Sequence, residues 1–82
     1  MQTLKISPKY FSDVLSGAKT FEVRSVLDRV FTVGELLKLC EYDCNGFTGR
    51  SFVVRVNYIL HGGQFGIEKN FVVLGIQTHF QL

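Results

Sequence analysis

Apolar and polar residues alternate with a period of two along much of this chain, and this periodicity constrains the fold more than any other feature. The longest example is RSFVVRVNYIL, residues 50–60, in which one set of alternating positions is apolar: Phe52, Val54, Val56, Tyr58 and Leu60. Such alternation is typical of a β-strand that buries one face. The segments TLKIS, KTFEVRS, VGELLKLCEYD and NFVVLGIQTHF also read as strands. The sequence therefore predicts a mainly β chain of about five strands.

A different period follows the first of these strands. Ser7 is a good N-cap, and Pro8 suits the first position of a helix. The next apolar residues are spaced i, i+3, i+4 and i+7, as on one stripe of a helix: Phe11, Val14, Leu15 and Ala18. Gly17 stands where a helix would end in a left-handed residue. We expect one short helix within residues 8–17 that packs through this stripe.

The chain has 82 residues, so we assign residues 1–82 to a single small domain. A domain of this size buries only about 60–65% of its unfolded surface, and the 46% of apolar residues supply the dense core that it needs. A flat sheet would leave two open edges, which curling into a barrel removes. The predicted fold class is α+β, mainly β: a small β-barrel of about five strands, with one short helix after the first strand. The segments DCNGFTGR and HGGQFG are predicted as loops.

Composition narrows the functional classes. The net charge of +2 is far below that of dedicated nucleic-acid binders, so any binding site must come from local placement of charge. No apolar run approaches the ~18 residues of a membrane span, and the N-terminus lacks the apolar core of a signal peptide. We expect a cytoplasmic protein with no membrane partner. Cys40 and Cys44 are then expected as two free thiols rather than a pair, and with no zinc-type spacing to a histidine they predict no metal site and no cofactor.

The segments LKISPKYFSDVLSGAKTFEVR, DRVFTVGELLKLCEYD, FTGRSFVVRVNYIL and FVVLGIQ together resemble the DUF3850 family, part of the ASCH group of PUA-like barrels. The resemblance runs from about Leu4 to Gln77. It includes the ASCH signature G-x-K-x-x-E-x-R, which falls on Gly17, Lys19, Glu22 and Arg24. The resemblance implies a β-barrel with a cleft between barrel and helix, onto which the signature residues project. It also implies an RNA- or nucleotide-related role, and many DUF3850 proteins look like products of phages and other mobile elements.

Some ASCH proteins are similar to amidohydrolases that remove an acetyl group from a modified cytidine. Lys19 and Thr20 match those enzymes, which carry a threonine at the position of Glu22 and a further acidic residue on an insertion that this chain lacks. The segment RSVLDRVF is also one residue longer than the usual family pattern R-x-N-D-R-x-F. We therefore carry over no catalytic residue, and an enzyme is the less favoured interpretation.

Thr20, Glu22 and Arg24 share one face of the predicted strand KTFEVRS. From the pattern alone, a solvated charged face is the simpler interpretation, and such an exposed pair contributes only about 0–1 kcal/mol. The signature places these groups in a cleft instead. There, Glu22 would orient Arg24 or accept from a base amino group, and Arg24 would hold a phosphate with its fork of donors.

The predicted RNA- or nucleotide-binding residues are five: Lys19, Thr20, Glu22, Arg24 and Arg29. Lys19 has the opposite strand parity, but the turn after the helix can aim it into the same cleft. Arg29, on the following loop, is a secondary phosphate contact, or forms only a local ion pair with Asp28. Phe47 and Phe65 are candidate platforms for base stacking, although small hydrophobic caps are the favoured interpretation.

Three functions remain open. The first is a module that binds RNA, a nucleotide or a modified nucleoside. The second is an amidohydrolase that acts on a modified nucleoside, with Lys19 as base or activator of a nucleophile. The third is a phage-type protein that binds and modulates a host protein through the barrel surface. We expect a monomer or a weak dimer.

Overall fold

Five strands and one short helix follow one another in the order expected from the sequence. The structure is a computed structural model that describes residues 1–80. Its elements are β1 (Gln2–Ile6), α1 (Pro8–Leu15), β2 (Phe21–Ser25), β3 (Leu36–Asp43), β4 (Gly46–His61) and β5 (Phe71–Gln77). The mainly β composition, the strand number and the helix after the first strand are confirmed. Within residues 1–80, no helix is long and apolar enough to cross a membrane.

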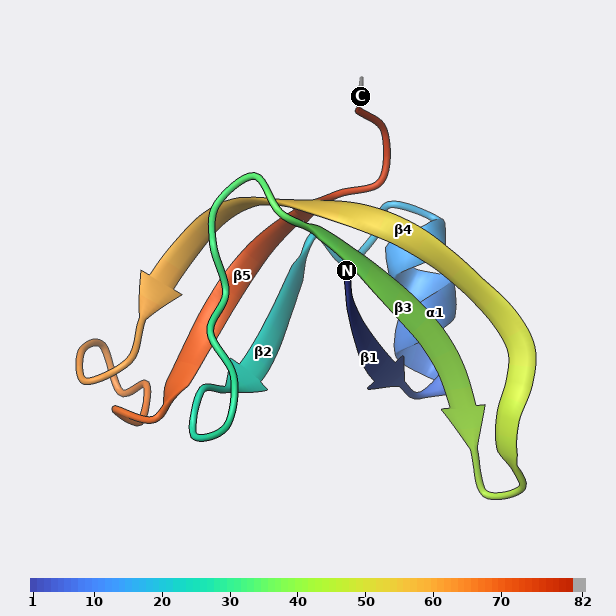
Figure 1. Ribbon diagram of the computed structural model, residues 1–82, viewed down its shortest axis with the longest axis horizontal. Helices are drawn as coiled ribbons and strands as arrows, with labels where there is room; N and C mark the ends of the chain where they lie inside the picture. The colour runs from blue at the N-terminus through green and yellow to red at the C-terminus, as the bar shows by residue number, and fades with distance from the viewer. Residues whose placement is uncertain (81–82) are drawn as a thin grey trace.

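The strands form one sheet in the order β1-β3-β4-β5-β2, with β1 parallel to β3 and the other pairs antiparallel. The sheet curls into a half-barrel, with β1 and β2 at its two edges (Figure 1). A side chain bridges these edges, because Arg24 Nη2 on β2 donates to the backbone carbonyl of Lys5 on β1 at 2.7 Å. The predicted barrel is therefore present as a curled sheet. Arg24 bridges the open seam between its two edge strands, β1 and β2.

The concave face of the half-barrel holds the core. Its buried apolar residues come from every strand except β2, from the loop before β3 and from α1: Leu4, Ile6, Phe11, Val14, Phe31, Leu37, Leu39, Val54, Val56, Val72, Leu74 and Ile76. The helix lies beneath β3 and β4 (Figure 1), where the Phe11 ring meets Phe52 edge-on at 4.9 Å between centroids. The expected packing of Leu15 is wrong, because the helix ends at that residue and leaves its side chain half-exposed.

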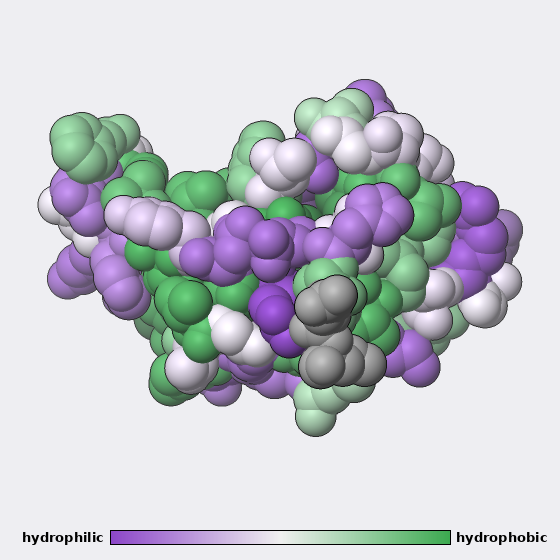
Figure 2. All heavy atoms as spheres, turned by 90° about the horizontal axis from the view of Figure 1, so that it is seen from above, coloured by the Kyte–Doolittle hydropathy of each residue, from purple (hydrophilic) through white to green (hydrophobic). Residues whose placement is uncertain are grey.

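The opposite, convex face is mixed in character. Seen from above, hydrophilic side chains form a band across the molecule, with hydrophobic side chains on either side of it (Figure 2). A sheet face of this kind is compatible with solvent, unlike the apolar concave face.

The longest strand, β4, departs from the sequence prediction at both ends. Its register shifts between Val56 and Tyr58, which marks a β-bulge. The bulge reverses the alternation beyond it, so Tyr58 is 65% exposed and Ile59 packs against the core instead. At the other end, Tyr42 pairs with Phe47 across a tight turn. Most of the segment predicted as the loop DCNGFTGR is therefore a hairpin of β3 and β4.

A buried carboxylate stabilises this hairpin. Glu41 is buried on the concave face and accepts hydrogen bonds from Arg50 Nε at 3.0 Å, Arg50 Nη2 at 2.8 Å and Thr48 Oγ1 at 2.6 Å. The Arg50 guanidinium also lies over the Phe11 ring, 4.7 Å from its centroid. Because Arg50 and then Thr48 favour the ionised form, the pKa of Glu41 falls to about 2 from its ordinary 4.5.

This lowered pKa predicts a specific acid sensitivity. The stabilisation from ionised Glu41 is fully present above pH 4.5 and is lost as the pH falls toward 2, because the unfolded chain binds the proton first. Urea unfolding measured across this range should show the midpoint of the wild-type protein falling with pH. In Glu41→Gln, part of that pH dependence should disappear, whereas Glu68→Gln, at an exposed carboxylate, should leave it unchanged. Parallel pH profiles for Glu41→Gln and the wild type would contradict the assignment.

Candidate functional site

Strand β2 turns its polar side inward. Glu22 is only 4% exposed, whereas its apolar neighbours Phe21 and Val23 are 46% and 50% exposed. The alternation itself is the one expected from the sequence. In the structure, however, the apolar face of β2 is exposed to solvent, and Glu22 on the other face is buried. A solvated charged face does not describe Glu22, because a buried carboxylate requires charge partners and hydrogen bonds.

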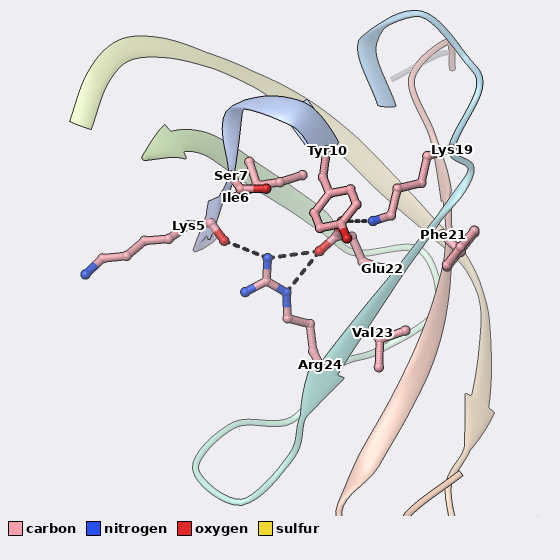
Figure 3. Close-up of a pocket in the computed structure, with 9 residues that line it drawn as sticks. All are labelled: Lys5, Ile6, Ser7, Tyr10, Lys19, Phe21, Glu22, Val23 and Arg24. Atoms are coloured by element: carbon pink, nitrogen blue, oxygen red, sulfur yellow. Dashed lines mark hydrogen bonds and ion pairs between the residues drawn. The ribbon is translucent and has the colours of Figure 1, made fainter. Parts of the chain in front are cut away.

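Two cations meet the Glu22 carboxylate from opposite sides (Figure 3). Lys19 Nζ donates to Oε1 at 2.5 Å, and Arg24 donates to Oε2 from Nε at 3.1 Å and from Nη2 at 2.9 Å. The Lys19 and Arg24 side chains are themselves 16% and 24% exposed. At neutral pH the cluster carries two positive charges and one negative charge, so it retains a net positive charge.

The turn after α1 brings Lys19 to this cluster. Gly17 adopts a left-handed conformation (φ 86°), which residues with a side chain rarely adopt. The Lys19 amide then donates to the carbonyl of Asp13 at 2.9 Å, which folds the chain back against the end of the helix. Lys19 therefore reaches the same carboxylate as Arg24 although its strand parity is opposite.

The cluster lies in a groove between β1, α1 and β2. The groove has a volume of about 510 Å³, within the range of small-molecule sites, and is lined by Lys5, Ile6, Ser7, Tyr10, Lys19, Phe21, Glu22, Val23 and Arg24. The rings of Tyr10 and Phe21 lie 5.0 and 5.1 Å from Lys19 Nζ. Both rings are about half-exposed, so the groove offers aromatic surface beside its charges.

Two polar groups at the groove have unused hydrogen-bonding capacity. Arg24 uses Nε and Nη2 for Glu22 and Lys5, while its Nη1 donates to no described residue. Ser7 is the N-cap of α1, yet its side chain makes no capping hydrogen bond. Both side chains line the groove, so each is a candidate donor to an anion bound there.

The groove gathers Lys19, Glu22 and Arg24 but not the other two predicted site residues. Thr20 is exposed and lies outside the groove, and its carbonyl accepts from the Ile76 amide at 3.0 Å. Arg29 lines a second cavity of about 280 Å³, next to His61. The nearest approach of Arg29 to Asp28 is 4.0 Å, a loose local ion pair.

Sequence reasoning missed Tyr10 and Phe21 as groove residues. Tyr10 precedes Phe11 and therefore lies off the apolar stripe of α1, which could have indicated its half-exposed position. Phe21 gave no such signal, because an apolar residue in an alternating strand is normally buried. Its exposure follows only from the inward direction of Glu22.

Phe47, near the start of β4, and Phe65, in the loop after β4, are not buried caps. Phe65 is 85% exposed and adopts a left-handed conformation (φ 53°) in a turn closed by the hydrogen bond from the Ile67 amide to the Gln64 carbonyl. Phe47 is 60% exposed and packs edge-on against Tyr42 at 5.0 Å between centroids. The interpretation as small hydrophobic caps is therefore wrong for Phe65. The Phe47 ring packs against Tyr42 but remains mostly exposed.

The described residues 1–80 contain no group of three or more His, Cys, Asp or Glu side chains that could hold a metal ion. Cys40 is partly exposed and Cys44 exposed, and they form no disulfide with each other.

Comparison with known proteins gives one result. A family model described as a domain of unknown function (DUF3850) matches residues 1–76, which is nearly the whole chain and includes every element except the last residue of β5. No curated protein matches the sequence.

Proposed function

The chain belongs to the DUF3850 family, and from this and the groove at β2 we propose that it is a small binding module that recognises RNA, a nucleotide or a modified nucleoside. One observation carries the proposal. The Glu22 cluster keeps a net positive charge, and Arg24 Nη1 is an unused donor in the same groove as the half-exposed rings of Tyr10 and Phe21, which lie about Lys19. A nucleotide combines the two features that such a groove complements, an anionic phosphate and a planar base.

In this proposal the three charged residues have different roles. Arg24 contacts the phosphate through Nη1, and Lys19 adds positive charge. Glu22 holds both cations in place, and its carboxylate lone pairs remain able to accept from a base amino group. Tyr10 and Phe21 offer ring faces for the base.

Two alternatives from the sequence have less support. An amidohydrolase needs a pocket that excludes water, whereas Tyr10, Phe21 and Val23 at this groove are about half-exposed. A protein-binding role would place its ligand on the barrel surface rather than at the buried Glu22. An ASCH/PUA-type relationship, a cytoplasmic location and a monomeric or weakly dimeric state remain predictions from the sequence.

Calorimetric titration with the four ribonucleoside monophosphates tests the proposal. We expect at least one of them to bind to the wild-type protein. Arg24→Gln should weaken that binding by at least about tenfold, because a charge-assisted hydrogen bond contributes roughly 1.5–3 kcal/mol. Mass spectrometry of small molecules and nucleic acid that co-purify with the native protein would identify the natural ligand.

Lys9→Gln is the matched control. Lys9 is an exposed lysine on α1 that pairs with Asp13 at 3.1 Å and does not line the groove. Its removal lowers the net charge by the same amount as Arg24→Gln and should leave binding unchanged. The proposal fails if none of the four monophosphates binds, or if Arg24→Gln binds as tightly as Lys9→Gln.

A further inference from the structure

A second surface of mixed cationic and aromatic character lies on the outer side of β1, β3 and β4. We call it the Lys5 patch, and it consists of Lys5, Lys38, Tyr42 and Phe47. Lys5 and Lys38 are exposed and belong to the outward set of alternating residues in β1 and β3. Tyr42 and Phe47 are exposed cross-strand partners. The patch thus presents ammonium groups and ring faces on one side of the sheet.

The contacts within the patch hold these groups together. Lys5 Nζ lies 4.5 Å from the centroid of the Tyr42 ring and 5.7 Å from that of Phe47. A shallow cavity of about 190 Å³ is lined by both Lys38 and Phe47. The acidic residues of these strands are directed elsewhere, because Glu41 is buried with Arg50 and Asp43 accepts from the Asn45 amide in the turn. The patch as defined therefore contains two lysines and no carboxylate.

The patch is continuous with the groove through one residue. The Lys5 carbonyl accepts from Arg24 at the groove, while the Lys5 side chain points away from it toward the rings. Figure 3 shows this divergence of the Lys5 backbone and side chain. A ligand in the groove thus needs to cross only the edge strand β1 to reach the patch.

We infer that the ligand is a single-stranded nucleic acid, with one nucleotide in the groove and a neighbouring base stacked on Phe47 and Tyr42. Lys5 and Lys38 contact the phosphates that connect them. Interleaved rings and cations are the features that bind single strands without a fixed sequence, because every base has a stackable face. This inference rests on the proposed function and adds that the ligand is longer than a mononucleotide.

The test compares a labelled RNA hexamer of random sequence, rN6, with the four monophosphates. Phe47→Leu keeps an apolar side chain but removes the ring, and the double variant Lys5→Gln/Lys38→Gln removes two charges. Each should weaken rN6 binding at least about fivefold, and Phe47→Leu should leave monophosphate binding unchanged. The log–log salt slope for rN6 should be about −3 in the wild type, for four phosphate contacts, and smaller by about 1.4 in the double variant.

Phe65→Leu is the control, because Phe65 is an exposed phenylalanine in the loop between β4 and β5, and this variant should bind rN6 like the wild type. Unchanged melting temperatures would show that the variants fold. The matched DNA hexamer dN6 distinguishes the two sources of a single strand. Equal binding of dN6 and rN6 means that the protein accepts either DNA or RNA, and weaker binding of dN6 means that the ligand is RNA.

The remaining outcomes separate the two proposals. If Arg24→Gln loses rN6 while Phe47→Leu and the double lysine variant retain it, the inference about the patch is wrong and the proposed function stands. If the patch variants lose rN6 but Arg24→Gln retains it, the groove role is wrong, and the inference that rests on it is wrong with it. Absence of binding to both rN6 and dN6 overturns the inference of a single-stranded ligand, while the four monophosphates still decide the proposed function. A loss of rN6 binding in Phe65→Leu equal to that in Phe47→Leu also overturns the inference about the patch.

Discussion

Replacing Glu22 by alanine is expected to destabilise the protein by about 3–5 kcal/mol, because it leaves two largely buried cations without their shared counter-ion. Lys19 and Arg24 are held by this one carboxylate, and Arg24 also ties the seam of the half-barrel at Lys5. Arg24→Ala alone should cost less, since Lys19 still pairs with Glu22. The double variant should cost less than the sum of the single variants by about 0.5–3 kcal/mol. Urea unfolding of the four proteins measures this coupling, and the same cycle in ligand binding should be equally non-additive.

The helix pair Lys9–Asp13 provides the comparison. It is a one-to-one ion pair at 3.1 Å with a well-exposed lysine, so its single alanine variants should each cost under about 1 kcal/mol and add independently. If the stability effects in the Glu22 cycle were as small and as additive as those in the Lys9–Asp13 cycle, the cluster would be no more than a surface ion pair. It would then no longer support a functional site at β2.

Gly62→Ala is expected to destabilise the protein by at least about 3 kcal/mol, at the upper end of the range for overpacked positions. An added Cβ would lie 1.9 Å from the carbonyl oxygen of Glu68 and 2.5 Å from that of Phe71. Both are backbone atoms, so neither can move aside by a change of rotamer. The Gly62 amide donates to the same Phe71 carbonyl at 2.9 Å, which joins the ends of β4 and β5.

Gly66→Ala, in the same loop, isolates the steric effect. An added Cβ there meets nothing within 4 Å, although φ is +78°, so the substitution should cost only about 1 kcal/mol. Urea unfolding of the two variants provides the measurement. A cost for Gly62→Ala equal to or below that for Gly66→Ala would show that the β4–β5 connection relaxes freely.

The strands could be predicted from the sequence because alternation is a local property, but the face that β2 buries could not. In β2 the pattern separates Phe21 and Val23 from Glu22 and Arg24, and hydrophobicity alone favours burial of the first pair. The structure buries Glu22, because Lys19 and Arg24 neutralise it. That compensation depends on a turn after the helix, which period-two reasoning does not include.

The bulge in β4 shows the same limit in another form. One irregular residue between Val56 and Tyr58 reverses the alternation, and nothing in the run RSFVVRVNYIL marks where it occurs. The grouping of Lys19, Glu22 and Arg24 was available in advance only from the family signature. The distance of Arg29 from the groove follows from the path of the loop between β2 and β3, which the sequence pattern does not specify.

The position of β2 at the edge of the sheet has a consequence for how the chain folds during synthesis. Among the described strands, β2 pairs only with β5, and Glu22 stands opposite Leu74, which comes three strands later in the chain. Contacts between such distant residues form slowly, because a large loop must close first. The charged residues of the groove therefore reach their places only after β5 has been translated. Ligand binding in a growing chain should appear only at that point and all at once, and would report that β5 has joined the sheet.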